Sequence, residues 1–195
     1  MGEETEQMKN PGGRPRNAEA SQAVLTSTIR LLSERGYAGL RINDIAEASG
    51  VAKTTIYRRW PTMTHLVVDA MEHALGQRSF EPTGNTEHDL DHLTEVALTN
   101  LIGEGESLLA IAFDIHHQSD PDLQTAYRRR IIDPIQEQAI LLITKAQQHG
   151  ELDKSCQPEA LVDAAIGGII YRIAILGEPM TINQAKQFWR EISQY

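Results

Sequence analysis

The segment from residue 42 to residue 60 constrains the fold of this chain more than any other part of the sequence. It reads Ile-Asn-Asp-Ile-Ala-Glu-Ala-Ser-Gly-Val-Ala-Lys-Thr-Thr-Ile-Tyr-Arg-Arg-Trp. Two short helices can cross closely here, because Ala46 is small enough for the crossing point and Gly50 accepts the positive φ of a tight turn. Four apolar side chains are expected to lock the helices together, namely Ile42, Ile45, Val51 and Ile56. This spacing predicts a helix-turn-helix.

The second helix of this pair has an open face of basic, hydroxyl and aromatic side chains. They are Lys53, Thr54, Thr55, Tyr57, Arg58 and Arg59. Such groups contact phosphates and base edges in the major groove of DNA. The sequence therefore predicts a recognition helix, and the alternative is an ordinary helical hairpin with a glycine turn.

The residues around the pair carry a family resemblance. The motifs are a first helix ending at Gly36-Tyr37, the Asp-Ile-Ala of residues 44–46, the Gly50-Val51 turn, the Thr-Ile-Tyr of residues 55–57 and the aromatic-Pro pair at 60–61. Over roughly residues 20–70 the chain resembles the DNA-binding domain of TetR-type transcriptional regulators. The resemblance implies a homodimeric repressor that binds a palindromic operator on double-stranded DNA. It also implies a small-molecule inducer that enters the helical body and releases the DNA.

Nine residues are expected to contact DNA. They are Arg41, Asn43, Lys53, Thr54, Thr55, Tyr57, Arg58, Thr62 and Thr64. The resemblance places Tyr57 against a phosphate, whereas Lys53 and Thr54 begin the recognition helix and are expected to read bases. Family members commonly carry a Lys where this chain has Met63, so we expect weaker anchoring of the next helix unless Met63 packs against its neighbours instead.

The net charge of −9 argues at first against DNA binding, but its distribution does not. Residues 14–60 hold eight Lys and Arg side chains against four Asp and Glu, a net +4. Residues 81–195 hold eight against eighteen, a net −10. Salt screens the acidic part beyond about 10 Å, so the basic part can still bind phosphates. The acidic part is expected to orient the basic part toward DNA.

The pattern of apolar residues, glycines and prolines predicts an all-α fold with three parts. Residues 1–16 are expected to be a disordered arm, residues 17–80 a DNA-binding head, and residues 81–195 a larger helical body for ligand binding and dimerisation. In the head, the first helix is expected at 17–35 and a linker helix at 63–79. Five body helices are expected, at 87–102, 106–118, 121–149, 158–176 and 181–194. Pro134 is expected to kink or interrupt the third of them.

Residues 158–176 are apolar nearly all round, which predicts a helix buried on both sides. Gly167 and Gly168 permit close backbone approach within it. The resemblance implies that the last two helices of each subunit form a four-helix dimer interface. Five residues are expected there, namely Ile169, Ile173, Leu176, Phe188 and Trp189. The alternative is that both helices close the core of a monomer.

The inducer is expected to contact apolar and aromatic side chains of the linker helix and the body. These are Met71, Leu75, Leu98, Leu101, Phe113, His117, Tyr127, Ile131 and Ile166. Sequence does not separate a side chain of the core from one that lines a pocket, because both are apolar at helical spacing.

Other chemistry finds little support in the sequence. Nucleophile-elbow, zinc-protease and phosphate-loop motifs are missing, and the pair His88 and His92 is more typical of a solvated helix face than of a zinc site. We therefore expect no catalytic residue, metal or cofactor. The single Cys156, the polar N-terminus and the lack of an apolar stretch long enough for a bilayer predict a cytoplasmic protein that does not enter the membrane. Two rival hypotheses remain: a small all-α enzyme or metal-binding bundle with an incidental helix-turn-helix, and an architectural DNA-binding protein without a ligand.

Overall fold

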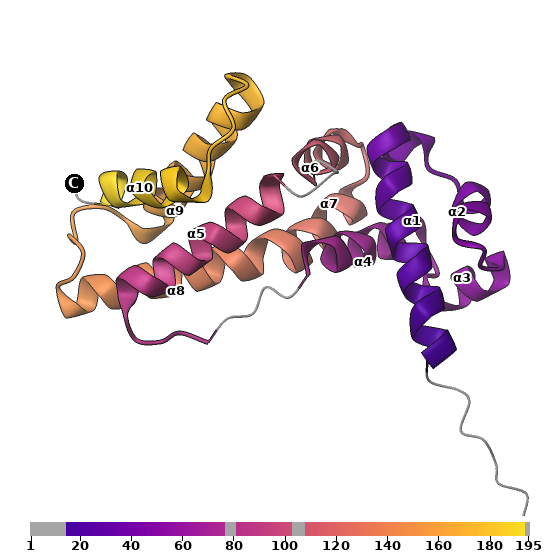
Figure 1. Cartoon of the computed structure of the whole chain (residues 1–195), viewed down its shortest axis with the longest axis horizontal. Helices are drawn as coiled ribbons and strands as arrows, with labels where there is room; N and C mark the ends of the chain where they lie inside the picture. Colours follow the sequence, from indigo (N-terminus) through magenta and orange to yellow (C-terminus); the bar gives the residue numbers. More distant parts are fainter. Residues whose placement is uncertain (1–14, 77–80, 103–107, 194–195) are drawn as a thin grey trace, which may run out of the picture.

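The computed structural model describes residues 15–76, 81–102 and 108–193, with the side chains of 15–17 and 100–102 excepted. Every regular element in these ranges is a helix, as the sequence predicts (Figure 1). The head contains α1 (Pro15–Gly39), α2 (Ile42–Ser49), α3 (Lys53–Arg59) and α4 (Met63–Leu75). The body contains α5 (Thr86–Ile102), α6 (Leu108–His117), α7 (Pro121–Tyr127), the π-helix η1 (Arg128–Ile132), α8 (Asp133–His149), α9 (Pro158–Ile170), a second π-helix η2 (Tyr171–Ile175) and α10 (Ile182–Ser193).

The molecule is elongated, with α1, α2 and α3 at one end and α9 and α10 at the other (Figure 1). Helices α5 and α8 pack against each other and form the long axis of the body. Helix α4 packs on α1 and also contacts α7 and η1, so it joins the two ends of the molecule. A change in the body near η1 therefore acts directly on the helix that follows the recognition helix.

The largest apolar core crosses the predicted boundary between head and body. Ile45 and Ile56 of the helix-turn-helix belong to the same cluster of buried side chains as Ile115, Leu123 and Ile131 of the body. A separate cluster fills the distal part of the body, with Leu90, Leu93, Leu142, Ile143, Leu161, Val162 and Trp189. The boundary predicted near residue 80 therefore does not separate two apolar cores.

The predicted helices differ from the observed ones mainly at their ends. The first helix begins at Pro15, two residues before its predicted start, and its regular part stops at Gly36, which has φ 66° and ψ 173°. Helix α4 ends at Leu75, because Gly76 adopts φ 65°, whereas the prediction extended it to residue 79. Residues 1–14 of the predicted arm lie outside the described residues.

The predicted interruption at Pro134 is confirmed. A proline has no N–H to donate to the carbonyl four residues earlier. The preceding turn widens into η1, in which the Asp133 N–H donates to the carbonyl of Arg128, five residues back. The single helix predicted for 121–149 is therefore three elements, and the π turn lies where the body contacts α4.

The helix predicted for residues 158–176 is not buried on both sides within one subunit. It divides into α9 and η2, and Tyr171 and Ile175 are 54% and 69% exposed. The gold-coloured end of this helix projects away from α5 in Figure 1. Its apolar side chains are therefore left partly exposed by the described part of the chain.

Candidate DNA-binding surface and ligand cavity

The helix-turn-helix has the geometry that the sequence predicts. Gly50 ends α2 with φ 68° and ψ 13°, in the left-handed region where a side chain is unfavourable. Ile45 and Ile56 are completely buried where the two helices meet. Ala46, at the crossing, packs against the same core. These contacts fix one face of α3 inward and leave the opposite face to solvent.

The outward face of α3 carries most of the predicted DNA contacts. Lys53, Thr54 and Arg58 are exposed, and Thr55 is half-buried. Tyr57 is 53% exposed, a large exposed fraction for an aromatic side chain. Asn43, on α2, is also exposed. Cationic, hydroxyl and aromatic groups together on one convex face suit a phosphate backbone and the edges of bases.

Two other predicted DNA contacts, Arg41 and Thr62, already have partners within the chain. Arg41 is exposed, and its Nη1 donates to the carbonyls of Ala38 and Leu40 at 2.8 Å each. The Thr62 hydroxyl caps α4 by accepting from the His65 N–H at 3.2 Å. These bonds orient both side chains at the surface, where both residues are still exposed and can contact DNA.

Thr64 differs from the other predicted contacts because it is turned toward the protein. It is half-buried, and its hydroxyl hydrogen-bonds the Tyr37 phenol. Met63 is also partly buried, packed against the head core. The structure thus favours the packing alternative for Met63.

Arg59 is a structural residue, although the sequence groups it with the exposed face of α3. Its Nη1 donates to the Ser21 hydroxyl on α1 and so ties the end of the recognition helix to the first helix. Its neighbour Trp60 is buried. The last turn of α3 is therefore anchored, while its first turn is open to DNA.

A chain of hydrogen bonds connects the end of the recognition helix to the body. Trp60 Nε1 donates to Asp69 Oδ2 on α4 at 2.7 Å. The other oxygen of Asp69 lies 2.7 Å from Nη1 of Arg130 on η1. Arg130 also contacts Glu72, with Nε 3.1 Å from Oε1. The carboxylates raise the pKa of Arg130 still further, with Glu72 the larger cause. The residue that follows α3 is therefore linked, through Asp69 of α4, to the guanidinium group of Arg130 on η1.

A second connection joins the kink of α1 to α6. The Tyr37 N–H donates to Asp114 Oδ2 at 2.6 Å, and Gln118 Nε2 donates to Asp114 Oδ1 at 3.0 Å. The Tyr37 hydroxyl donates to Asp120 at 3.3 Å. Burial, and then the negative charge of Asp120, raise the pKa of Tyr37, against the opposing effect of Thr64. Apart from the Gly36-Tyr37 motif, no sequence pattern indicated these contacts.

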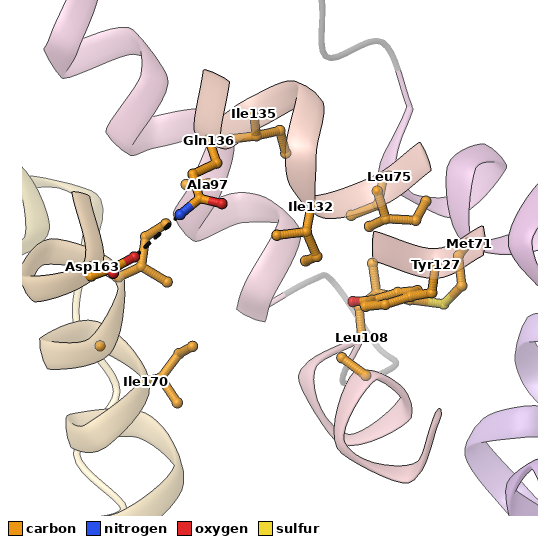
Figure 2. Close-up of a pocket in the computed structure, with 14 residues that line it drawn as sticks. Met71, Leu75, Ala97, Leu108, Tyr127, Ile132, Ile135, Gln136, Asp163 and Ile170 are labelled. Atoms are coloured by element: carbon orange, nitrogen blue, oxygen red, sulfur yellow. Dashed lines mark hydrogen bonds between the residues drawn. The ribbon is translucent and has the colours of Figure 1, made fainter. Parts of the chain in front are cut away.

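A cavity of about 390 Å³ lies in the body beside α4 (Figure 2). That volume is in the usual range for small-molecule sites. Five of the nine predicted ligand residues line it: Met71, Leu75, Tyr127, Ile131 and Ile166. The sequence missed the other nine lining residues, namely Ala97, Leu108, Ala112, Ile132, Ile135, Gln136, Asp163, Gly167 and Ile170.

The other predicted ligand residues with described side chains do not line this cavity. Leu98 is buried in a small distal cluster with Ile169, Met180 and Ala185. Phe113 is 43% exposed on α6, and His117 is exposed at its end. The Leu101 side chain lies outside the described residues. Leu98 was misassigned because a core leucine has the same residue type and spacing as one that lines a cavity.

The predicted dimer residues differ in how far their side chains are exposed. Ile169 and Trp189 are buried in the cores of their own subunit, so neither offers a surface to a partner. Phe188 packs on Gly168 so closely that a methyl group there would lie 2.5 Å from the Phe188 Cζ. Ile173 is partly buried, and Leu176 is 46% exposed. The large exposed apolar residues of this region are the predicted Leu176 and three residues that the sequence analysis did not name, Tyr171, Ile175 and Ile182.

The described ranges contain neither a candidate metal site nor a helix that could span a membrane. Within them, no three His, Cys, Asp or Glu side chains gather closely enough to hold an ion. Nor does any helix of residues 15–76, 81–102 or 108–193 combine the length and apolar character needed to cross a bilayer.

Comparison with known proteins agrees with this arrangement. Residues 24–70 match the family described as bacterial regulatory proteins, tetR family, and residues 80–192 match the tetracyclin repressor-like C-terminal domain. The chain is 31% identical to the uncharacterised regulator YdeS of Bacillus subtilis, over 88% of this chain and 86% of the relative. It is 25% identical to the DNA-binding transcriptional repressor TetR of Mycobacteroides abscessus, over 85% and 87%. Among solved structures, it is similar to the TetR family regulator SCO0332, with 27% identity, a TM-score of 0.60, and 89% and 96% of the two chains covered.

Proposed function

The chain belongs to the TetR family of DNA-binding transcriptional regulators, and on that premise we propose that it is a repressor released from a palindromic operator by a small molecule in the body cavity. The single observation that carries the DNA-binding part is the exposed face of α3, with Lys53, Thr54, Tyr57 and Arg58 outward and Ile56 completely buried. The relative from Mycobacteroides abscessus is named a repressor, which supports the direction of control. Such a protein acts on bacterial DNA in the cytoplasm.

The exposed apolar residues of η2 and the start of α10 support a homodimer. Tyr171, Ile175 and Leu176 are each about half exposed or more, and Ile182 follows on α10. Large apolar side chains left exposed in neighbouring elements are typical of an interface. Two copies of α3 held at fixed spacing read two half-sites, which gives the operator its two-fold symmetry.

The cavity supports control by a ligand. Its walls include Met71 and Leu75 of α4 and Ile131 and Ile132 of η1, the same two elements that Arg130 links to Trp60. An occupant that separates α4 from η1 therefore alters the support of the recognition helix. A difference of about 1–3 kcal/mol in ligand affinity between the two arrangements is enough for such control. An architectural DNA-binding protein needs no cavity of this kind.

The test begins with selection of operators from genomic DNA fragments by the purified full-length protein. We expect a palindromic sequence, a dimer at micromolar concentration, and affinity that falls steeply with salt. Lys53→Ala should weaken binding, whereas Lys154→Ala, an exposed loop lysine of the body, is the matched control. Small molecules are then screened for release of the operator. A monomer, or binding insensitive to salt, contradicts the proposal.

A further inference from the structure

The body cavity is apolar but has one charged side chain at its edge. Of the fourteen described residues that line it, Asp163 alone has an acidic side chain, and no Lys, Arg or His is among them. Gln136 and Tyr127 are the other lining residues with polar side chains, apart from which the wall is aliphatic. Among the described lining residues, the electrostatic character of the site is therefore set by a single carboxylate.

The carboxylate has a defined position. Gln136 Nε2 on α8 donates to Asp163 Oδ1 on α9 at 3.2 Å, across one side of the cavity (Figure 2). Tyr127 lies toward the opposite side, with Met71, Leu75 and Leu108 around it (Figure 2). Between these two regions the wall is formed by Ile132, Ile170 and similar residues. The cavity thus has a polar edge near Asp163 and an apolar interior that extends to α4.

We infer that the natural ligand of this cavity is an amphipathic cation, with an ammonium or guanidinium group beside Asp163 and an apolar body that reaches α4. The inference rests on the proposed function, since it names the class of inducer. A cation entering the cavity exchanges water for a charge-assisted hydrogen bond to Asp163. An anion of the same size meets a carboxylate and no described cationic lining group, so its desolvation is not compensated.

The same geometry gives the cation a route to the DNA-binding end. When its charged group is held at Asp163 on α9, its apolar body lies against Met71 and Leu75 of α4. The length of the apolar body then determines how far α4 is displaced. Charge is expected to govern affinity, and length is expected to govern release.

The test uses three probes that share a ten-carbon chain: decylammonium, 1-decanol and decanoate, each below its micellar concentration. They are titrated calorimetrically into the full-length wild type, into Asp163→Asn and into Glu159→Gln. Glu159 lies in the first turn of the same helix, is exposed and does not line the cavity, so its variant is the matched control for lost charge. The affinity for decanol reports whether each variant keeps an intact cavity.

We expect wild type to bind decylammonium about tenfold more tightly than decanol and to bind decanoate most weakly, as a charged hydrogen bond near the surface implies. Asp163→Asn should remove the preference for the cation and leave the decanol affinity unchanged, whereas Glu159→Gln should keep the preference. Decanoate binding as tightly as decylammonium, a preference that survives Asp163→Asn, or no binding of any probe overturns the inference.

Operator release is measured separately, by fluorescence anisotropy of labelled operator DNA, so that the two proposals fail independently. A cation that binds through Asp163 but never releases the operator contradicts the proposed induction and leaves the ligand class standing. An anion that releases the operator supports induction and overturns the ligand class.

Discussion

Replacing Gly36 with alanine is expected to destabilise the protein by about 3 kcal/mol, through two effects that the structure separates. Gly36 has φ 66° and ψ 173°, a conformation open almost only to glycine, and forcing alanine into it costs about 1–3 kcal/mol. The new Cβ would also lie 3.2 Å from Asp114 Oδ2. That carboxylate is held by Tyr37 and Gln118, so it yields only by weakening its hydrogen bonds.

Gly50→Ala is the matched control. Gly50 also has a positive φ, of 68°, but nothing lies within 4 Å of the Cβ it would carry. Its ψ of 13° belongs to the ordinary left-handed region, where alanine costs about 1–2 kcal/mol. The difference between the two variants reports the extra strain at Gly36 and the contact with Asp114.

The assay is urea unfolding followed by circular dichroism, at one fixed protein concentration because a dimer's stability depends on it. A parallel thermal scan should show the same loss as a fall in Tm of about 6–12 °C, the effect of about 3 kcal/mol in a chain of this size. In an Asp114→Ala background, the cost of Gly36→Ala should shrink toward that of the backbone strain alone. If Gly36→Ala proves no more destabilising than Gly50→Ala, the account of this contact is wrong.

Four further predictions concern other contacts. Arg130→Gln should lower the free energy of unfolding by about 1–2 kcal/mol, a modest loss because the ion pairs are partly exposed, as denaturation would show. It should also reduce ligand-induced release of DNA in operator titrations, and unchanged release would count against the link through η1. Tyr57→Phe should weaken binding to all sequences alike, whereas Lys53→Ala should alter the preferred bases in a selection experiment, and a reversal of these effects would exchange the two roles. Met63→Lys should lower Tm by a few degrees and leave the salt dependence of binding unchanged; a log–log slope steeper by about two would show instead that this position reaches phosphates. The hydrogen bonds of the 83–84 loop hold the pKa of Asp89 below its ordinary value, despite burial that acts the other way. Its stabilising contribution is thus complete above the ordinary value and is lost as pH falls through the lower folded value, so unfolding curves of wild type and Asp89→Asn should converge in acid.

The helix-turn-helix was predictable from sequence because its determinants are local. Gly50 supplies the turn, and Ile45 and Ile56 lie at fixed spacing on either side of it. No distant residue is needed to decide how these two helices cross. Pro134 likewise predicted an interruption of its helix. The π geometry of η1 was not predictable, because it depends on packing against α4.

The cavity was predictable only in part, because its walls depend on how distant helices meet. Ile135 lines the cavity and Leu98 fills a core, yet both are aliphatic residues on amphipathic helices. Asp163 offered the clearest available signal, since it is a lone carboxylate within the apolar stretch of α9. A hydroxyl near the recognition helix, such as that of Thr64, suggests a contact with DNA. The Thr64 hydroxyl hydrogen-bonds Tyr37, a contact that only the fold reveals.

The core shared by the two ends of the molecule limits how regulators of this kind can be recombined. A chimaera joined at residue 80 would set Ile115, Leu123 and Ile131 of one protein against α1 and α4 of another. The transplanted DNA-binding head would then keep its operator preference, but its apolar contacts with the new body would not match. An exchange of specificity is better made by replacing only the outward residues of α3, from Lys53 to Arg58, because their inward neighbour Ile56 keeps its native contacts.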